Sequence, residues 1–202
     1  MSWEGWLLLA LLALLAVGWI LWLLANRVDR LHRRVLQSRA TLEIQLAQRA
    51  TAAVELGLSG ALDPVEAVLV ADAAHRALSL TPNRVIRDGL GDPEELIAIE
   101  AFPHQPSIDR SLVESELSRT LRTVLESYEL DSLSEEDPGS EALRRLDAAW
   151  FRLEVARRFH NAHVAEVRRL RSHPVVRLLR LAGRAPMPRP IEMDDARPHH
   201  HP

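Results

Sequence analysis

The chain has 202 residues, of which 47% are hydrophobic and only 4% aromatic, and its formal net charge is -3. This size suits one domain with an anchor and tails, and the Ala- and Leu-rich composition favours helices. A net negative charge argues against a general nucleic-acid binder, which needs a basic surface. The absence of Cys excludes disulfides, thiol catalysis and Cys-ligated metals.

The first element is an apolar segment, residues 7–25, that contains no charged side chain. A helix needs about 20 such residues to cross the hydrocarbon core of a bilayer, whereas a buried core helix is shorter and has a polar face. The segment has tryptophans near both ends, as in the aromatic belts of membrane proteins: Trp3, Trp6, Trp19 and Trp22. Residues 1–25 are therefore predicted to be a transmembrane anchor.

A cleaved signal peptide is the main alternative, but it would carry a basic start, a shorter apolar stretch and a small-residue cleavage site. Here Glu4 is the only charged residue before the apolar segment, and no Ala-x-Ala pattern follows the segment. The positive charges come after it. These charges are Arg27, Arg30, Arg33, Arg34 and Arg39. The positive-inside rule then predicts a single-pass protein with its N-terminus outside and its C-terminal domain in the cytoplasm.

Helical periodicity continues directly out of the apolar segment. Apolar residues recur at spacings of three, four or seven between positions 28 and 53, and no Gly or Pro lies between Leu21 and Leu56. The anchor and the first domain helix are therefore expected to form one continuous rod. Gly57 and Gly60 end it, and Asp63-Pro64 supplies an N-cap followed by proline at the first helical position.

Further helices are predicted over residues 64–80, 106–130 and 140–172, with a short basic helix over 175–181. The region 82–106 is weakly structured apart from a short helix near 94–101, and 129–141 is an acidic loop. Residues 26–182 are thus predicted to be an all-α antiparallel bundle of about four helices, with its long first and last helices side by side. The Pro- and His-containing tail, 183–202, is expected to be disordered.

Four short segments resemble the LemA family of bacterial membrane proteins. After the apolar helix come 26–28 (Asn-Arg-Val) and 42–49 (Leu-Glu-Ile-Gln-Leu-Ala-Gln-Arg), and far downstream come 156–161 (Ala-Arg-Arg-Phe-His-Asn) and 172–174 (Ser-His-Pro). Members of that family carry an anchor, an Asn-containing exit from it, a helix close to I-D-V-Q-L-K-R-R, and a late helix with A-R-R-F-Y-N before F-P.

The chain departs from this family pattern at several positions. Glu43 stands where the family has Asp, Val54-Glu55-Leu56 replaces P-N-L-V, His160 replaces Tyr, and a second Y-N is missing near Val167. The resemblance is weak across 62–141. It implies a divergent LemA member in a bacterial plasma membrane, with long antiparallel helices beneath one N-terminal span. It implies no defined molecular activity.

One arrangement of side chains raises the possibility of a metal site. His160, His163 and Glu166 recur at three-residue intervals, so they lie near one face of a helix and could ligate a zinc-like ion. No H-E-x-x-H spacing and no fourth ligand accompany them. The simpler interpretation is that His160 replaces a core aromatic residue and that His163 faces water. The run 199–201 of three histidines is interpreted as part of the disordered end.

Arginines are concentrated in two regions, just after the anchor and near the C-terminal end of the last long helix. The candidate contacts for anionic lipid or a partner protein are Arg27, Arg30, Arg33, Arg34, Arg168, Arg169 and Arg171. The alternative is a solvated helix face on which Glu154 and Glu166 pair with neighbouring arginines.

These observations predict a membrane-anchored helical scaffold or adaptor without a cofactor or a catalytic motif. Its expected partners are the lipid bilayer, an unknown partner protein and, through the bundle or the span, a second copy of the chain in a homo-oligomer; nucleic acid is not expected. The alternative hypothesis is a membrane-anchored metal-binding protein or enzyme accessory that uses the His/Glu helix face.

Overall fold

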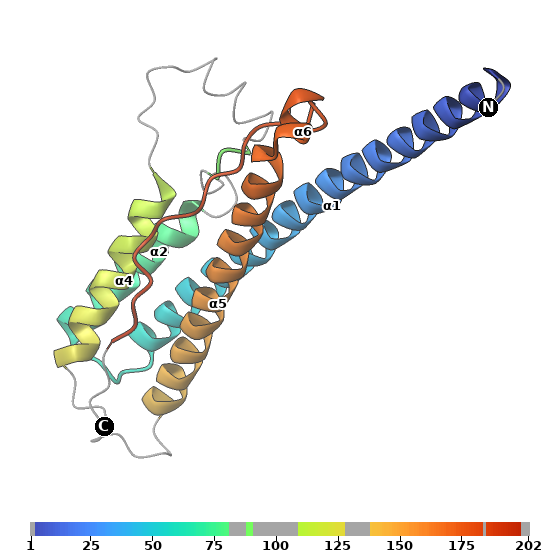
Figure 1. The fold of residues 1–202 in the computed structure, drawn as a ribbon. Coiled ribbons are helices and arrows are strands. Elements are labelled where there is room, and N and C mark those ends of the chain that lie inside the picture. Colours follow the sequence, from blue (N-terminus) through green and yellow to red (C-terminus); the bar gives the residue numbers. More distant parts are fainter. Residues whose placement is uncertain (1–2, 81–87, 91–108, 128–137, 184, 199–202) are drawn as a thin grey trace.

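The computed structural model describes residues 3–80, 88–90, 109–127, 138–183 and 185–198. These residues form α1 (Trp3–Leu58), α2 (Pro64–Leu80), α4 (Arg110–Ser127), α5 (Pro138–Ser172) and the short α6 (Pro174–Leu178). Successive long helices run in opposite directions (Figure 1). The predicted all-α fold, an apolar N-terminal helix followed by an antiparallel bundle, is confirmed. The predicted short helix over 94–101 lies outside the described residues.

The helix α1 is continuous over 56 residues, so the apolar segment and the first bundle helix are one element, as the sequence predicts. Its N-terminal part projects away from the bundle (Figure 1), and its side chains become buried only from Val28 onward. The helix ends where Gly60 adopts a φ of +79°, a left-handed conformation that suits glycine. Asp63 then caps α2, because its Oδ1 accepts a hydrogen bond of 3.0 Å from the backbone N–H of Val65.

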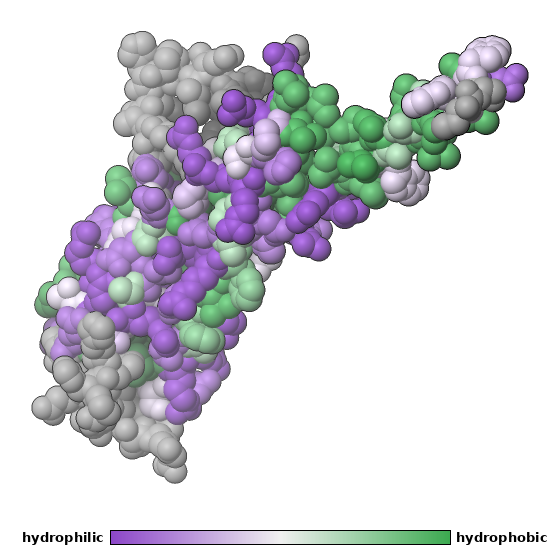
Figure 2. Space-filling model, viewed as in Figure 1, coloured by the Kyte–Doolittle hydropathy of each residue, from purple (hydrophilic) through white to green (hydrophobic). Residues whose placement is uncertain are grey.

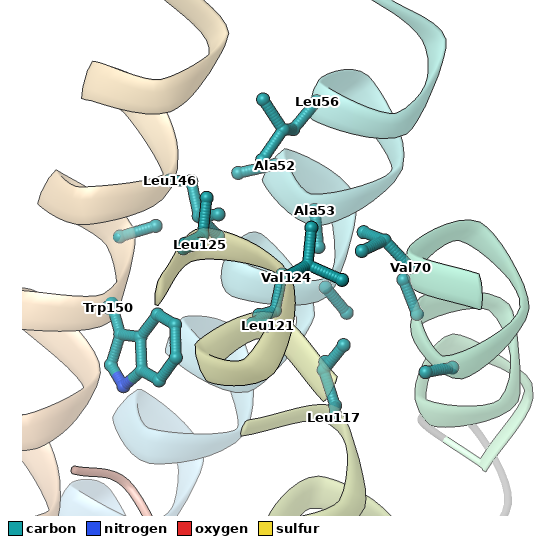
Figure 3. Close-up of a cluster of buried hydrophobic side chains, with 14 of the residues drawn as sticks. Ala52, Ala53, Leu56, Val70, Leu117, Leu121, Val124, Leu125, Leu146 and Trp150 are labelled. Carbon is teal, nitrogen blue, oxygen red and sulfur yellow. The ribbon is translucent and has the colours of Figure 1, made fainter. Parts of the chain in front are cut away.

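The largest cluster of buried side chains lies in the half of the bundle distant from the apolar segment. It joins Ala53 and Leu56 of α1, Val70 of α2, Leu121 of α4 and Trp150 of α5 with their neighbours (Figure 3). Burial of each large apolar side chain contributes about 1.5–3 kcal/mol. Because every long helix contributes to it, this cluster holds the four helices in one unit.

A second cluster lies nearer to the apolar segment and joins the two longest helices. Leu31 and Val35 of α1 pack there with Val164 and Val167 of α5, and Leu90 covers them. The long first and last helices are therefore side by side along most of the bundle, as predicted.

The C-terminal tail differs from its prediction. Residues 185–198, here called the strap, lie in an extended conformation against the bundle rather than as a disordered end (Figure 1). Ile191 is only 2% exposed and packs on Leu42, Leu46 and Leu153. The strap passes so close to Gly89 that a Cβ on that residue would lie 2.9 Å from the Met187 carbonyl oxygen. The prediction failed because the strap is held by contacts with distant residues, which composition does not reveal.

We expect Ile191→Ala to lower the free energy of unfolding by about 2–5 kcal/mol, because it leaves a cavity against three fully buried leucines. Thermal or urea unfolding of the detergent-solubilised chain measures this change. The control is Met187→Ala on the same strap, where the side chain is 44% exposed and little stability should be lost. Equal effects of the two substitutions would contradict the inward role of Ile191.

Candidate functional site

A groove of about 560 Å³ runs along the outside of the bundle between α1 and α5. On α5 its wall is formed by Phe151, Val155 and Phe159, which are four residues apart and therefore lie in one line along the helix. The two phenyl rings are 51% and 62% exposed, and the guanidinium of Arg197, at the end of the strap, lies 5.3 Å from the ring centroid of Phe151. Large aromatic side chains held at a groove in this way are typical anchors for a binding partner.

The opposite wall of the groove belongs to α1 and is polar. Gln37, Thr41 and Gln45 form it at the same four-residue spacing, and the Thr41 hydroxyl donates a 3.1 Å hydrogen bond to the Gln37 carbonyl oxygen. Arg34 lines one end of the groove and Arg152 lies toward the other. Within the described residues, neither guanidinium has a carboxylate at ion-pair distance. The groove therefore combines an apolar wall with cationic ends.

The groove continues into a second hollow further from the apolar segment, with a volume of about 820 Å³. The two share Gln45 and Arg152, and Glu55 marks the far limit on α1. From Arg34 to Glu55 the helix rises about 32 Å. The open face between α1 and α5 is therefore long enough to receive several turns of another helix.

His160 lies behind the groove, fully buried between α5 and α1. The Ser38 hydroxyl donates to the Val35 carbonyl oxygen at 2.9 Å, so it accepts from His160 Nδ1, which lies 3.0 Å away. This assigns the proton of a neutral imidazole to Nδ1. Burial lowers the pKa of His160, and Arg39 and His163 lower it further, against the opposing charge of Asp88.

Charged side chains continue from His160 along the inside of the bundle. Arg39 lies 3.3 Å from the carboxylate of Asp88 and 3.6 Å from that of Glu43. Burial raises the pKa of Glu43, and the positive charges of Arg110 and Arg39 oppose that rise. Oppositely charged groups thus alternate across three parts of the chain: α1, the segment 88–90 and α4.

The most deeply buried charges form an ion pair between α1 and α4. Arg49 Nη2 lies 2.8 Å from Glu114 Oε2, and Nη1 donates to the Ser118 hydroxyl at 2.6 Å. The guanidinium carbon is 5.6 Å from the ring centroid of Trp150. Burial lowers the pKa of Arg49, and Glu114 counteracts that effect. The pair sits in the core and away from both hollows, so we assign it a structural role.

The segment 156–161, which supports the LemA resemblance, anchors the strap. The Asn161 side chain makes two hydrogen bonds to the backbone of Ile191. It accepts one from the N–H at 2.9 Å and donates the other to the carbonyl oxygen at 3.1 Å. Arg157 holds Asp195 by two hydrogen bonds of 2.6 Å each. From the other side, Arg122 of α4 lowers the pKa of Asp194 by hydrogen bonding to it. The strap thus joins α4 to α5.

The residues proposed for a metal site do not converge. His160 points toward α1 and is buried, His163 lines the groove, and Glu166 is exposed. Within the described part of the chain, no group of three or more His, Asp or Glu side chains could hold an ion. The histidine run at 199–201 lies outside the described residues.

The arginines expected to contact lipid or a partner fall into two sets. Most of them are exposed: Arg27, Arg30, Arg33, Arg34, Arg168 and Arg169. Arg33 pairs with Asp29 at 2.8 Å. Arg171 differs, because its guanidinium donates to the carbonyl oxygens of Ala185 and Pro186 and so holds the start of the strap. For the exposed arginines, contact with lipid or a partner stays a prediction.

Sequence reasoning missed the groove and the buried charges, although both leave a signal. Phe151 and Phe159 are apolar residues outside the buried stripe of α5, at a spacing that puts them on one face. Arg39 and Arg49 stand at positions where the three–four spacing of α1 requires a core residue. An apolar residue off the stripe, or a charge on it, is the signal in each case.

Compared with models of known protein families, with curated proteins and with solved structures, the chain gives no match. The LemA resemblance therefore rests on the short segments described above. The function has to be inferred from the geometry of the groove and of the apolar helix.

We expect Arg49→Met to lower the free energy of unfolding by about 3–5 kcal/mol, because it removes one partner of a buried pair. The double variant Arg49→Met with Glu114→Leu should recover only part of this loss, since it also takes the Glu114 carboxylate away from the buried guanidinium of Arg110, 3.5 Å away. Chemical denaturation in detergent measures both. The control is Arg76→Met, whose pairs are half exposed and should be worth only about 0–1 kcal/mol. If Arg49→Met lowered the free energy of unfolding by only this small amount, the structural role of the buried ion pair would be contradicted.

The lowered pKa of His160 predicts a pH dependence of stability. Because the folded protein binds this proton less readily than the unfolded chain, the free energy of unfolding should fall as the pH drops below the ordinary value of 6.5. His160→Gln should remove this dependence. Glu43 has a raised pKa, so its contribution to the free energy of unfolding falls as the pH rises above 4.5. This contribution is the same in the unsubstituted protein and in His160→Gln. Parallel stability curves for the two proteins on both sides of pH 6.5 would refute the effect.

Proposed function

We propose that the chain is a single-pass, membrane-tethered scaffold or adaptor whose bundle presents the groove between α1 and α5 to a partner protein. The observation that carries this proposal is the position of the groove. One of its walls belongs to α1, the same unbroken helix that contains the apolar segment. A partner bound there is held at a fixed height and orientation relative to the membrane.

The apolar half of α1 supports the tether. Its most apolar stretch is long enough to cross a membrane, and none of that stretch is buried inside the structure. A core helix of a soluble protein would be covered by its neighbours. A cleaved leader would end near residue 25, whereas α1 continues without a break into the clusters that hold the bundle together. We interpret the segment as an uncleaved span.

The exposed arginines support an orientation. Arg27, Arg30 and Arg34 follow the span directly, on the side where the bundle lies. By the positive-inside rule the bundle is cytoplasmic and the N-terminus faces outward. With the LemA resemblance, the membrane is a bacterial plasma membrane and the chain a divergent relative of that family. The architecture that the resemblance implies, long antiparallel helices beneath one span, agrees with the bundle.

The groove indicates the chemistry of its partner. Phe151 and Phe159 offer apolar contacts eight residues apart, and Arg34 and Arg152 offer positive charge toward the two ends. A helix that lays apolar residues into such a groove places its own flanking residues against the arginines. The partner is therefore an amphipathic helix with acidic residues beside its apolar face.

A photo-crosslinking amino acid at position 159 should join the full-length chain, in native membranes, to a different protein. Phe151→Ser should abolish that product, because an aromatic anchor at a docking site usually contributes about 2 kcal/mol or more. Arg152→Glu should weaken it by charge repulsion. Mass spectrometry of the product identifies the partner and its contact segment.

The matched control is Val68→Ser, at a 67% exposed position on α2 that does not line the groove. It should leave the crosslink unchanged. A crosslinked product that consists of two copies of this chain would contradict the adaptor proposal and indicate self-association instead. A product that survives Phe151→Ser and Arg152→Glu, or no product at all, would disprove docking in the groove.

A further inference from the structure

The short helix α6 lies level with the end of the apolar segment. Val167 of α5 packs beside Leu31 of α1, and the two helices run in opposite directions. Six residues further along the chain is His173, directly after the end of α5, and six residues back along α1 is Ala25, each about 9 Å toward the span. Since α6 begins at Pro174, it stands at the depth where the apolar segment ends.

Several apolar side chains of α6 and the residue after it face away from the bundle. Val176 is buried, with 2% of its surface exposed, and holds the helix in place. Leu178 is 83% exposed, Leu179 45% and Val175 37%. Figure 2 shows hydrophobic atoms both along the projecting part of α1 and at α6. These side chains therefore face the surroundings close to the membrane boundary.

The chain segment that contains α6 carries charged residues of one sign only. Residues 167–191 contain seven arginines and no Asp or Glu. Arg177 and Arg180 are exposed, and among the residues that the structure describes neither has a carboxylate at ion-pair distance. Apolar tips interleaved with arginines are the composition of segments that lie in the headgroup layer of an anionic membrane.

The tryptophans of α1 mark the same depth independently. Trp19 and Trp22 lie at the end of the apolar segment with their ring centroids 5.2 Å apart. Indole rings concentrate at the boundary between hydrocarbon and headgroups. The boundary that they mark is within one or two helical turns of Ala25, and hence of α6.

We propose that α6 is a second membrane contact, in which Leu178, Leu179 and Val175 enter the headgroup layer while Arg177 and Arg180 bind phosphates of anionic phospholipids. This inference rests on the proposed span. The contact fixes the tilt of the bundle, because a helix that crosses the bilayer and a second point on its surface together define an orientation. The groove between α1 and α5 is then held at one angle to the membrane.

The test uses single cysteines in the full chain, which has no cysteine of its own. Leu178→Cys carries an environment-sensitive fluorophore, and the protein is placed in nanodiscs of phosphatidylcholine and phosphatidylglycerol. Docking shifts the emission to shorter wavelength, and lipids brominated near the headgroup quench it. Leu58→Cys, 79% exposed and about 50 Å from the span along α1, should show neither effect. Trp22→Cys reports the span itself.

The electrostatic part is tested by the lipid and by the arginines. Nanodiscs of phosphatidylcholine alone should reduce quenching at position 178, and so should Arg177→Ala with Arg180→Ala. The ratio of docked to undocked α6 should fall roughly fivefold for each arginine removed. Quenching that is independent of both changes would overturn the role of the arginines.

The remaining outcomes separate this inference from the proposed span. Quenching at position 22 without quenching at 178 overturns the docking of α6 and leaves the span intact. Absence of quenching at both positions overturns the span as well. An emission shift at 178 without quenching means that the side chain is covered by protein, either the bundle or a second copy, and also overturns the docking.

Discussion

The continuity of α1 is the constraint on which the rest of the structure depends. One helix is adapted to two surroundings. Its first half exposes apolar side chains on all sides, and its second half buries one stripe of side chains in the bundle. No flexible segment separates the two halves. Every element packed on the second half therefore has a defined rotation and height relative to the first, which makes the positions of the groove and of α6 meaningful with respect to a membrane.

The bundle that surrounds α1 is held by apolar contacts and oriented by polar ones. The large cluster around Leu121 and Trp150 supplies most of the burial, but the hydrophobic effect is non-directional and by itself allows helices to slide against one another. The Arg49–Glu114 pair tolerates much less, since a displaced partner would leave a charge buried without compensation. The strap adds a further restraint by joining α4 to α5. The combination explains how a chain with few aromatic residues maintains one arrangement.

Two faces of the bundle differ in what covers them. On one, the strap lies over the junction of α4 and α5, bound by Asn161 and Arg157. On the other, the junction of α1 and α5 is open along Phe159, and the strap reaches its edge only where the Arg197 guanidinium lies 5.3 Å from the ring centroid of Phe151. The covered face shows how this bundle holds an extended segment, through backbone hydrogen bonds and paired carboxylates. The open face offers aromatic anchors instead, and this suits a helix better than an extended chain.

The sequence by itself determined the elements that depend on local pattern. The apolar length of residues 7–25, the three–four spacing after Val28 and the Asp63-Pro64 start predicted the helices and their antiparallel order, because these signals act between near neighbours. Only the tertiary structure decided the strap, the groove and the buried charges. Ile191 meets Leu42, and Arg49 meets Glu114, across long separations in the chain. Such contacts are set by how whole helices pack, which no local period encodes.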